Sequence, residues 1–348
     1  MRNEYFALYC QQQDQEVLQD VANSLVMRHS ALRSSFFPNT TSPPIVHSKA
    51  LVDFRVVKCE NRSASDVTDL VHMFCHLPFD LQGPRAPNST ALLRVCVFHS
   101  LPRSLLRTIP EGMSNIVIFA APAIAVDKRS LSILLDDASV LYQVGKLGGN
   151  VGTTTGQQYE QHTILSPVEC DFPLFLKYRS EVCSNKQGDQ LWSFWRRVLV
   201  EPLPVLHLPT DRLRPAQRTF LSSTISFETP QELYTKMHAF SRNENYPLRT
   251  VVCTLFHSLL FRYTSQTDVL LGINMPCREE SEIKQTVGHL ENVVPLRGNF
   301  QGNPTLKMML ERHSSLMQAA EAHCDMPMSE LLKRQQTGSA TSHQRQDD

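Results

Sequence analysis

The chain alternates between short apolar runs and longer stretches in which apolar residues recur at helical spacing. Residues 116–120, with the sequence IVIFA, predict a strand that is buried on both faces. Residues 129–142 then carry apolar side chains at helical spacing, which predicts a helix. The turn between them holds one carboxylate, Asp127, followed by Lys128, Arg129 and Ser130. Because a turn held between packed elements can present polar side chains to a cleft, these four residues are the first candidates for a functional site.

The same periodicities predict elements over the rest of the chain. Amphipathic stripes predict helices over residues 14–28, 64–76, 172–182, 187–200, 230–242, 248–264 and 304–323. We expect Thr229 and Glu232 to form a capping box, and Asn303 to cap the last of these helices. Short runs predict strands over residues 5–10, 45–47, 54–57, 91–98, 114–121, 222–227 and 269–273. The runs 91–98 and 114–121 are joined by a polar connection, so we expect them to pair antiparallel.

Composition places the protein among ordinary globular chains. Its 348 residues are 41% hydrophobic and 20% charged, which is enough for a large core and favours two lobes over one. Basic and acidic residues number 34 each, so no net field favours nucleic acid or an anionic membrane as a partner. The N-terminus lacks a signal-peptide pattern, and no run of about eighteen apolar residues occurs. We therefore expect a cytoplasmic protein with no membrane partner.

The nine cysteines are scattered along the chain. They include no C-x-x-C pair, and no histidine stands at ligand spacing beside a pair of cysteines. We therefore expect reduced, mostly buried thiols, no metal site and no bound cofactor.

Six segments occur in a fixed order along the chain: RHSALRSSF (28–36), PFDL (78–81), the turn and helix from residue 122, LPTDRLRPA (208–216), VGHLENVVPLR (287–297) and HCDMPMSELL (323–332). Together they resemble the condensation domains of nonribosomal peptide synthetases, whose patterns are RHxxLRxxF, PFDL, HHxxxDG, LPTDRPRPA, IGxFVNTxPLR and HQDxPFExLV. The resemblance covers residues near 5 to 335.

The resemblance implies a fold and a division of the chain. The fold is α/β (α+β), with two chloramphenicol-acetyltransferase-like lobes that form a V-shaped pseudo-dimer of mixed sheets covered by helices. We expect an N-terminal lobe over residues 1–150, a connecting segment over 151–186, a C-terminal lobe over 187–335 and a disordered tail over 336–348. The family's opening motif and its closing segment have no counterpart, so we expect a chain truncated at both ends, with the second lobe incomplete.

The reactive centre departs from the family pattern. On HHxxxDG, Asp127 takes the Asp position and Lys128 the Gly position, while Pro122 and Ala123 take the two His positions. The resemblance implies that the second His orients or deprotonates the attacking amine, or stabilises the tetrahedral intermediate. An imidazole suits these roles because it both accepts and donates protons at neutral pH, whereas Ala123 does neither.

Two histidines are candidate substitutes. His289 could face the junction of the lobes, and we expect His99 to lie one strand away from Ala123. A hydrolase-like arrangement of Ser130, His289 and Asp127 is conceivable, but we prefer a buried, architectural pair between Arg33 and Asp127. The resemblance implies further structural roles at motif positions; these residues are Arg28, His29, Arg33, Asn292 and Arg297.

Three functional hypotheses follow. The first is a pseudoenzyme that retains the fold, docks carrier proteins, their phosphopantetheine arms or neighbouring synthetase modules, and has lost amide formation. The second is an active acyltransferase of the same family that uses His289, or Lys128 as a stabiliser of the oxyanion. The third is a relic or gene fragment without a stable fold.

Overall fold

The computed structural model describes residues 2–343, with gaps at 12, 38–42, 83–89, 108, 150, 152–164, 279–280 and at 213, 214, 216, 218, 220–222, 224 and 226. The described residues divide into two compact units. The first consists of Met1–Ser180 together with Arg278–Glu291, and the second of Glu181–Cys277 and Asn292–Asp348. The lobe bounds expected from the sequence, near 150 and 187, stay a prediction.

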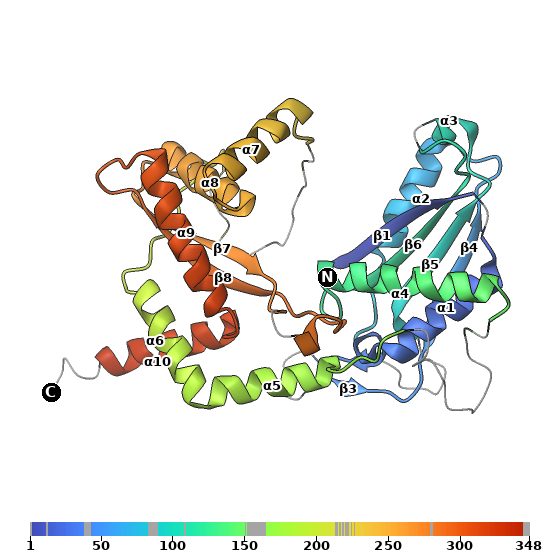
Figure 1. Cartoon of the computed structure of the whole chain (residues 1–348), viewed down its shortest axis with the longest axis horizontal. Helices are drawn as coiled ribbons and strands as arrows, with labels where there is room; N and C mark the ends of the chain where they lie inside the picture. The colour runs from blue at the N-terminus through green and yellow to red at the C-terminus, as the bar shows by residue number, and fades with distance from the viewer. Residues whose placement is uncertain are drawn as a thin grey trace. The chain divides into compact units, whose positions relative to one another are not determined.

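The first unit is built on a four-stranded sheet (Figure 1). Its strand order is β1 (Asn3–Cys10), β6 (Asn115–Pro122), β5 (Thr90–His99) and β4 (Leu51–Lys58). β6 pairs antiparallel with both neighbours, and β4 runs parallel to β5, so the sheet is mixed. Every residue of β6 is buried, which confirms the predicted strand and its antiparallel partner.

Helices cover both faces of this sheet because successive side chains of β6 point to opposite sides. Val117 and Phe119 pack with α1 (Gln15–Arg28) and α4 (Lys128–Lys146), which lie side by side. Ile116 and Ile118 pack on the other face with α2 (Ala64–His76) and the short α3 (Arg103–Leu106). The remaining elements of the unit are η1 (Ser30–Arg33), the pair β2 (Ser34–Ser35) and β3 (Ile45–Val46), η3 (Ser281–Ile283), and α5 (Phe172–Ser184), which extends into the second unit.

The second unit contains a two-stranded antiparallel sheet of β7 (Asp268–Met275) and β8 (Asn292–Asn299). The segment between these strands, Arg278–Glu291, belongs to the first unit. The other helices of the second unit are α6 (Lys186–Val198), α7 (Gln231–Asn243), α8 (Leu248–Thr264), α9 (Leu306–Ala322) and α10 (Met328–His343). α9 packs against α8 and β8, which buries Met309, Leu310 and Met317.

Several local expectations differ from the structure. The helix predicted from 304 begins later, and Thr305 rather than Asn303 caps it by accepting a hydrogen bond from the Met308 N–H. Pro230 stands at the N-cap of α7 without a side-chain cap, so the Thr229–Glu232 capping box does not form. α10 runs to His343, and its first turns are supported by an ion pair between Glu330 and Arg334. The tail expected over residues 336–348 stays a prediction. The strand expected at 222–227 lies partly outside the described residues.

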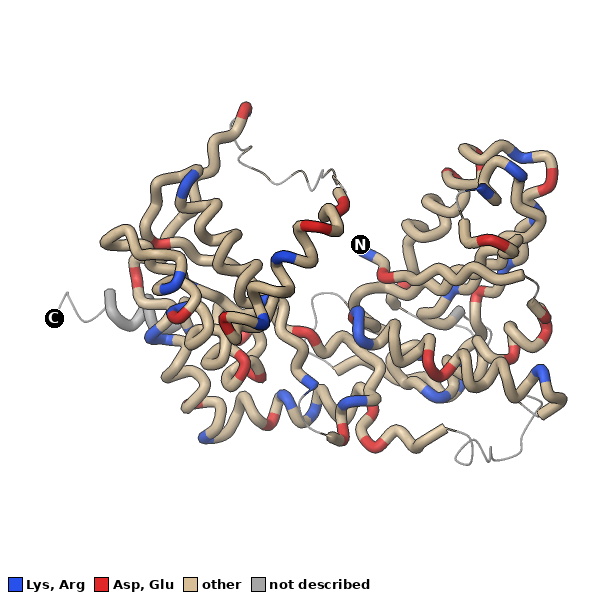
Figure 2. Tube along the Cα trace, turned by 45° about the horizontal axis from the view of Figure 1, so that its top comes forward, with Lys and Arg blue, Asp and Glu red and all other residues tan. Residues whose placement is uncertain are grey.

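Charge is distributed evenly over both units. Figure 2 shows Lys and Arg interspersed with Asp and Glu along the chain, in keeping with the formal net charge of zero. Within the part of the chain that the structure describes, no helix is both long enough and apolar enough to span a bilayer.

Candidate functional site

Asp127 lies where β6 gives way to α4. The strand ends at Pro122, and Asp127 is the N-cap residue of the helix that begins at Lys128. Its Oδ1 accepts hydrogen bonds from the backbone N–H and the hydroxyl of Ser130, both at 2.8 Å. A carboxylate at this position satisfies a backbone N–H at the start of the helix and complements the helix dipole.

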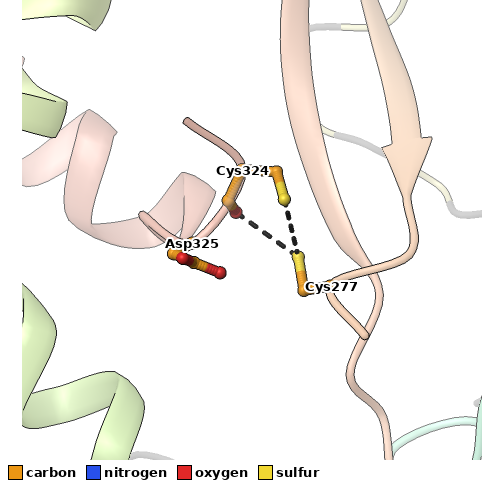
Figure 3. Close-up of side chains that lie close together, drawn as sticks. All are labelled: Cys277, Cys324 and Asp325. Carbon is orange, nitrogen blue, oxygen red and sulfur yellow. Dashed lines mark hydrogen bonds between the residues drawn. The ribbon is translucent and has the colours of Figure 1, made fainter. Parts of the chain in front are cut away.

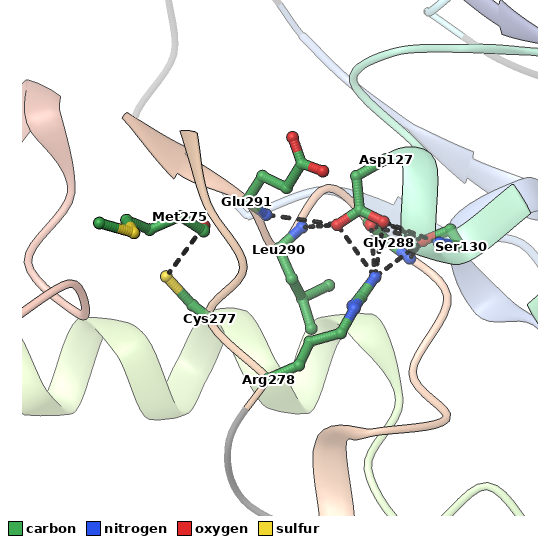
Figure 4. A network of polar contacts seen from close by, with 8 residues as sticks. All are labelled: Asp127, Ser130, Met275, Cys277, Arg278, Gly288, Leu290 and Glu291. Carbon is green, nitrogen blue, oxygen red and sulfur yellow. Dashed lines mark hydrogen bonds and ion pairs between the residues drawn. The ribbon is translucent and has the colours of Figure 1, made fainter. Parts of the chain in front are cut away.

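The partner of Asp127 is Arg278 (Figure 4). Arg278 Nη2 donates to Oδ1 at 2.7 Å and to Oδ2 at 2.9 Å, and the two side chains are 6% and 1% exposed. The backbone N–H groups of Leu290 and Glu291 also donate to Oδ2, at 3.0 and 3.3 Å. Both oxygens of Asp127 are thus engaged by the segment 278–291, so this carboxylate fixes that segment to the start of α4.

Ser130 completes the network. Its buried hydroxyl lies 2.8 Å from the carbonyl oxygen of Gly288 and accepts hydrogen bonds from the Gly288 N–H at 3.0 Å and from Arg278 at 2.9 Å. A side chain at 288 would meet the ring of Phe172 and lie 2.8 Å from Leu290 Cδ1, so only glycine permits this approach. The hydroxyl is committed to structure and is not a nucleophile facing a cleft.

The expected pair between Arg33 and Asp127 is wrong. Arg33 Nη1 donates to the backbone carbonyl of His47 at 2.6 Å, and burial lowers the pKa of Arg33 although Asp171 opposes that shift. The true partner, Arg278, lies 151 positions away from Asp127 in the sequence. In the sequence, Arg278 is an arginine three residues after the end of β7, within NMPCREE, and nothing local to it indicates that it is the partner of Asp127.

Arg28 and His29 converge on a carboxylate that sequence reasoning did not single out. Asp137, on α4, accepts from Arg28 Nε at 2.9 Å and lies 2.9 Å from His29 Nε2. Burial lowers the pKa of His29, so the neutral imidazole donates its Nε2–H to Asp137. These bonds join the end of α1 to the middle of α4.

Asn292 and Arg297 have comparable roles in the second unit. The Asn292 amide donates to the carbonyls of Cys324 and Met326 at 2.7 and 2.6 Å. The Arg297 guanidinium donates to Asp268 at 2.9 Å from Nε and 2.7 Å from Nη2, and also to two backbone carbonyls at the end of α6 and just after it. Both side chains hold backbone segments in place.

Ala123 follows β6, at the position where the motif resemblance implies a histidine. Its side chain is half-buried, and its backbone N–H donates to the carbonyl of Arg2 at 3.0 Å. Strand register shows that His99 is not a substitute close to Ala123. In the antiparallel pair of β5 and β6, Arg94 lies opposite Ala120 and Phe98 lies opposite Ile116. His99 ends β5, the strand next to β6 as expected, but it lies beyond the opposite end of β6 from Ala123 and is not close to it.

His289 is exposed, between two residues whose backbone groups bond to Ser130 and Asp127. It precedes β8, which begins at Asn292. Because Ser130 and Asp127 are buried and bonded to Arg278, the three residues do not form the arrangement of a serine hydrolase. His289 remains the one predicted candidate with an imidazole exposed beside the Asp127 network.

Comparison with known proteins identifies the family. The sequence model described as "Condensation domain" matches residues 117–345, more than half of the chain. The chain belongs to the condensation-domain family. The mixed sheets and helices of this condensation domain match solved members of the chloramphenicol-acetyltransferase-like fold, as the motif resemblance implied. A similar protein is tyrocidine synthase 2 of Brevibacillus parabrevis, which is 26% identical over 322 residues.

The matches cover nearly all of this chain but a smaller share of each relative or solved structure. The alignment with tyrocidine synthase 2 covers 92% of this condensation domain but 8% of that relative. The X-domain from teicoplanin biosynthesis superposes with a TM-score of 0.76 at 19% identity, covering 95% of this chain and 68% of that one. The same X-domain in complex with OxyB gives a TM-score of 0.73 at 18% identity, covering 96% and 68%. At these identities the solved structures show a shared fold.

Proposed function

We propose that this protein is a condensation domain of nonribosomal peptide synthesis that retains the fold but does not form amide bonds through the family's histidine. The observation that carries the proposal is Ala123 at the turn after β6, beside an Asp127 network that is fully formed. The scaffold around the turn is kept while the group that would move a proton is absent from the motif.

The loss has a chemical consequence of known size. A positioned general base contributes about 10²–10⁴-fold to the rate, and an alanine methyl group supplies neither a proton acceptor nor a donor. Lys128 is exposed at the first position of α4, where the family pattern has glycine. The lysine places a long cationic side chain there and does not restore the imidazole that the motif resemblance implies.

One observation favours a second candidate, an active acyltransferase that uses His289. The residues on both sides of His289 bond to Ser130 and Asp127, so the exposed imidazole is carried on a segment fixed beside the start of α4. An imidazole there could accept the proton of an attacking amine. This candidate predicts activity that depends on His289 and not on Ala123.

The chemistry test uses carrier-bound acyl donors and free amines. We expect the native chain to form amide at the background rate and Ala123→His to raise that rate by about 10²-fold, within the range for a general base. Ala123→Gln is the matched control, since it adds a similar volume without a basic imidazole. Turnover by the native chain that is lost in His289→Ala would replace the proposal with the second candidate.

A docking role is the function proposed for the retained fold, and a cytoplasmic location goes with it. The solved complex of the X-domain with OxyB supports the idea that this fold is used as a docking surface. We propose that the partner here is a carrier protein with its phosphopantetheine arm, or a neighbouring synthetase module. Isothermal titration with holo and apo carrier proteins tests this: saturable binding that weakens without the arm supports it, and no heat from either form contradicts it.

The hypothesis of an unstable relic is tested by the same preparation. The extensive buried core of each unit predicts cooperative unfolding, because loss of one packed side chain exposes its neighbours. A broad, non-cooperative thermal transition together with a silent amide assay would support the relic.

A further inference from the structure

Three potential ligand atoms converge in the second unit, at the point where β7 ends (Figure 3). Cys277 follows β7 by two residues, and Cys324 and Asp325 lie in the turn between α9 and α10. The two sulfurs and a carboxylate oxygen all lie within 4.8 Å of one another. Both cysteines are buried, and Asp325 is half-buried. Two segments that are 47 positions apart thus bring two thiols and one carboxylate together.

The spacing of the sulfurs suits a bound cation. Cys277 Sγ lies 3.5 Å from Cys324 Sγ. Two thiolates on a tetrahedral zinc ion, each with a Zn–S distance of about 2.3 Å, are about 3.8 Å apart. A disulfide would require about 2.0 Å between the same atoms. The sulfurs therefore need to move by only a few tenths of an ångström to share a metal ion, and by much more to form a covalent bond.

The turn that carries two of these groups is held in place by a side chain of β8. The Asn292 amide donates to the carbonyls of Cys324 and Met326, which flank Asp325, and its Oδ1 accepts from the Met328 N–H at 3.2 Å. The backbone on both sides of Asp325 is therefore fixed. Ligands held by such supporting bonds lose little freedom when a metal binds, which favours affinity.

We propose that Cys277, Cys324 and Asp325 bind a thiophilic divalent cation, with Zn²⁺ as the best fit. Two thiolates and one carboxylate are ligands that zinc accepts, and a water molecule or a further oxygen donor completes four-coordination. Binding releases the thiol protons, so affinity rises with pH. The ion would link the end of β7 to the α9–α10 turn and stabilise the second unit.

One of the three proposed ligands is a residue at which this chain departs from the family motif. Cys324 stands where the family's HQDxPFExLV pattern has glutamine, in the segment HCDMPMSELL. A cysteine at that position gains a ligand role only because Cys277 meets it from another segment. Cysteine spacing along the sequence could not reveal this pair.

The test measures zinc retained by the reduced, full chain. Protein treated with a chelator is dialysed against Zn²⁺ and analysed for metal, and Co²⁺ or Cd²⁺ is added to record thiolate-to-metal charge-transfer absorption. We expect one equivalent of metal and the sulfur absorption band. Cys324→Ser should weaken binding at least about 100-fold and Asp325→Asn about 10-fold, because each removes one ligand.

Matched controls keep the result interpretable. Cys10→Ser removes a half-buried thiol of the first unit and should leave zinc binding unchanged. Asp325→Asn keeps the volume of the side chain, so a reduced affinity in a variant with native circular dichroism separates lost ligation from misfolding. Metal content in the native chain no higher than in Cys324→Ser overturns the proposal. So does quantitative disulfide formation between Cys277 and Cys324 in mild peroxide with no zinc uptake in the reduced protein.

Discussion

Arg278 reaches both carboxylate oxygens of Asp127 with a single nitrogen, Nη2, and the same nitrogen lies 2.9 Å from the Ser130 hydroxyl. Burial lowers the pKa of Arg278, and the charge of Asp127 opposes that shift. Removing two charges from water costs free energy, which their attraction and hydrogen bonds must offset. The pair therefore fixes the segment 278–291 in one position, and removing one partner should lower the free energy of unfolding.

Arg278→Met should destabilise the first unit strongly. The substitution leaves the Asp127 carboxylate buried without its cation, which typically costs about 3–5 kcal/mol. Urea unfolding followed by circular dichroism measures the loss. Arg129→Met is the control. Arg129 is exposed in the first turn of α4, two residues after Asp127, and its substitution should change the free energy of unfolding by less than about 0.5 kcal/mol. The double variant Asp127→Asn/Arg278→Met should recover part of the loss, and a simple sum of the two single effects would contradict this account.

Gly288→Ala should be destabilising because of space rather than backbone conformation. The new Cβ would meet the Phe172 ring and lie 2.8 Å from Leu290 Cδ1, so the backbone bonds of Gly288 to Ser130 must shift. Overpacking of this kind costs about 1–3 kcal/mol. Adding Phe172→Leu should restore part of the stability by making room. Equal stability of Gly288→Ala and the native chain in urea would show that the segment adjusts without cost.

Substitution on the outer face of α8 should improve behaviour in solution without loss of stability. Phe256 is 50% exposed and Tyr263 67% exposed, and neighbouring apolar side chains of the helix are exposed as well; these are Val252, Leu255 and Leu259. Exposed apolar surface of this extent promotes self-association. Phe256→Gln should lower binding of a hydrophobic dye and the apparent mass in light scattering, with a melting temperature within about 2 °C of the native value. A drop of more than about 5 °C would mean that Phe256 is packed in the native state.

Strong periodicity makes most of the fold predictable. The helices at 64–76 and 248–264 have the predicted bounds, because each shows a persistent apolar face or a capping box: Ser63 and Asp66 bond reciprocally at the start of α2. Helix ends elsewhere are less predictable. Asn303 and Thr305 both precede α9, and the choice between them depends on side-chain geometry that sequence does not carry.

The candidate site is likewise predictable from the sequence only in part. Asp127 is predictable because its turn lies between two strongly patterned elements. Sequence reasoning pairs it with Arg33, a conspicuous motif residue, whereas Arg278 and Asp137 act through contacts between segments that are more than a hundred positions apart. Long-range pairing of charges leaves no periodic signal. The cluster of Cys277, Cys324 and Asp325 escapes prediction for the same reason, since its two segments do not have ligand spacing.

Acid should weaken the second unit through a buried pair of histidines. His257 on α8 and His313 on α9 are both fully buried, and His313 Nε2 lies 2.9 Å from His257 Nδ1. Because His313 Nδ1 faces the Met309 carbonyl at 2.8 Å, it carries the proton there, and the hydrogen bond between the rings is donated by His257. Burial lowers the pKa of His257 to about 4, with a further contribution from His313, and burial also lowers the pKa of His313.

Stability falls as the pH drops when the unfolded state binds protons more tightly than the folded state. At pH values between 6.5, the ordinary histidine pKa, and about 4, the unfolded chain is protonated at His257 whereas the folded chain is not. Stability is therefore full at neutral pH and falls as the pH drops through this window, by about 2 kcal/mol at pH 5 for one group. The chain has two tryptophans, Trp192 and Trp195, and both lie on α6 of the second unit, so their fluorescence during urea unfolding reports on that unit. His257→Gln should flatten the dependence between pH 7 and pH 5, whereas His72→Gln, on α2 of the first unit, should leave it unchanged. An unfolding midpoint that is equal at pH 7 and pH 5 in the native chain would mean that water reaches the pair and lets it titrate normally.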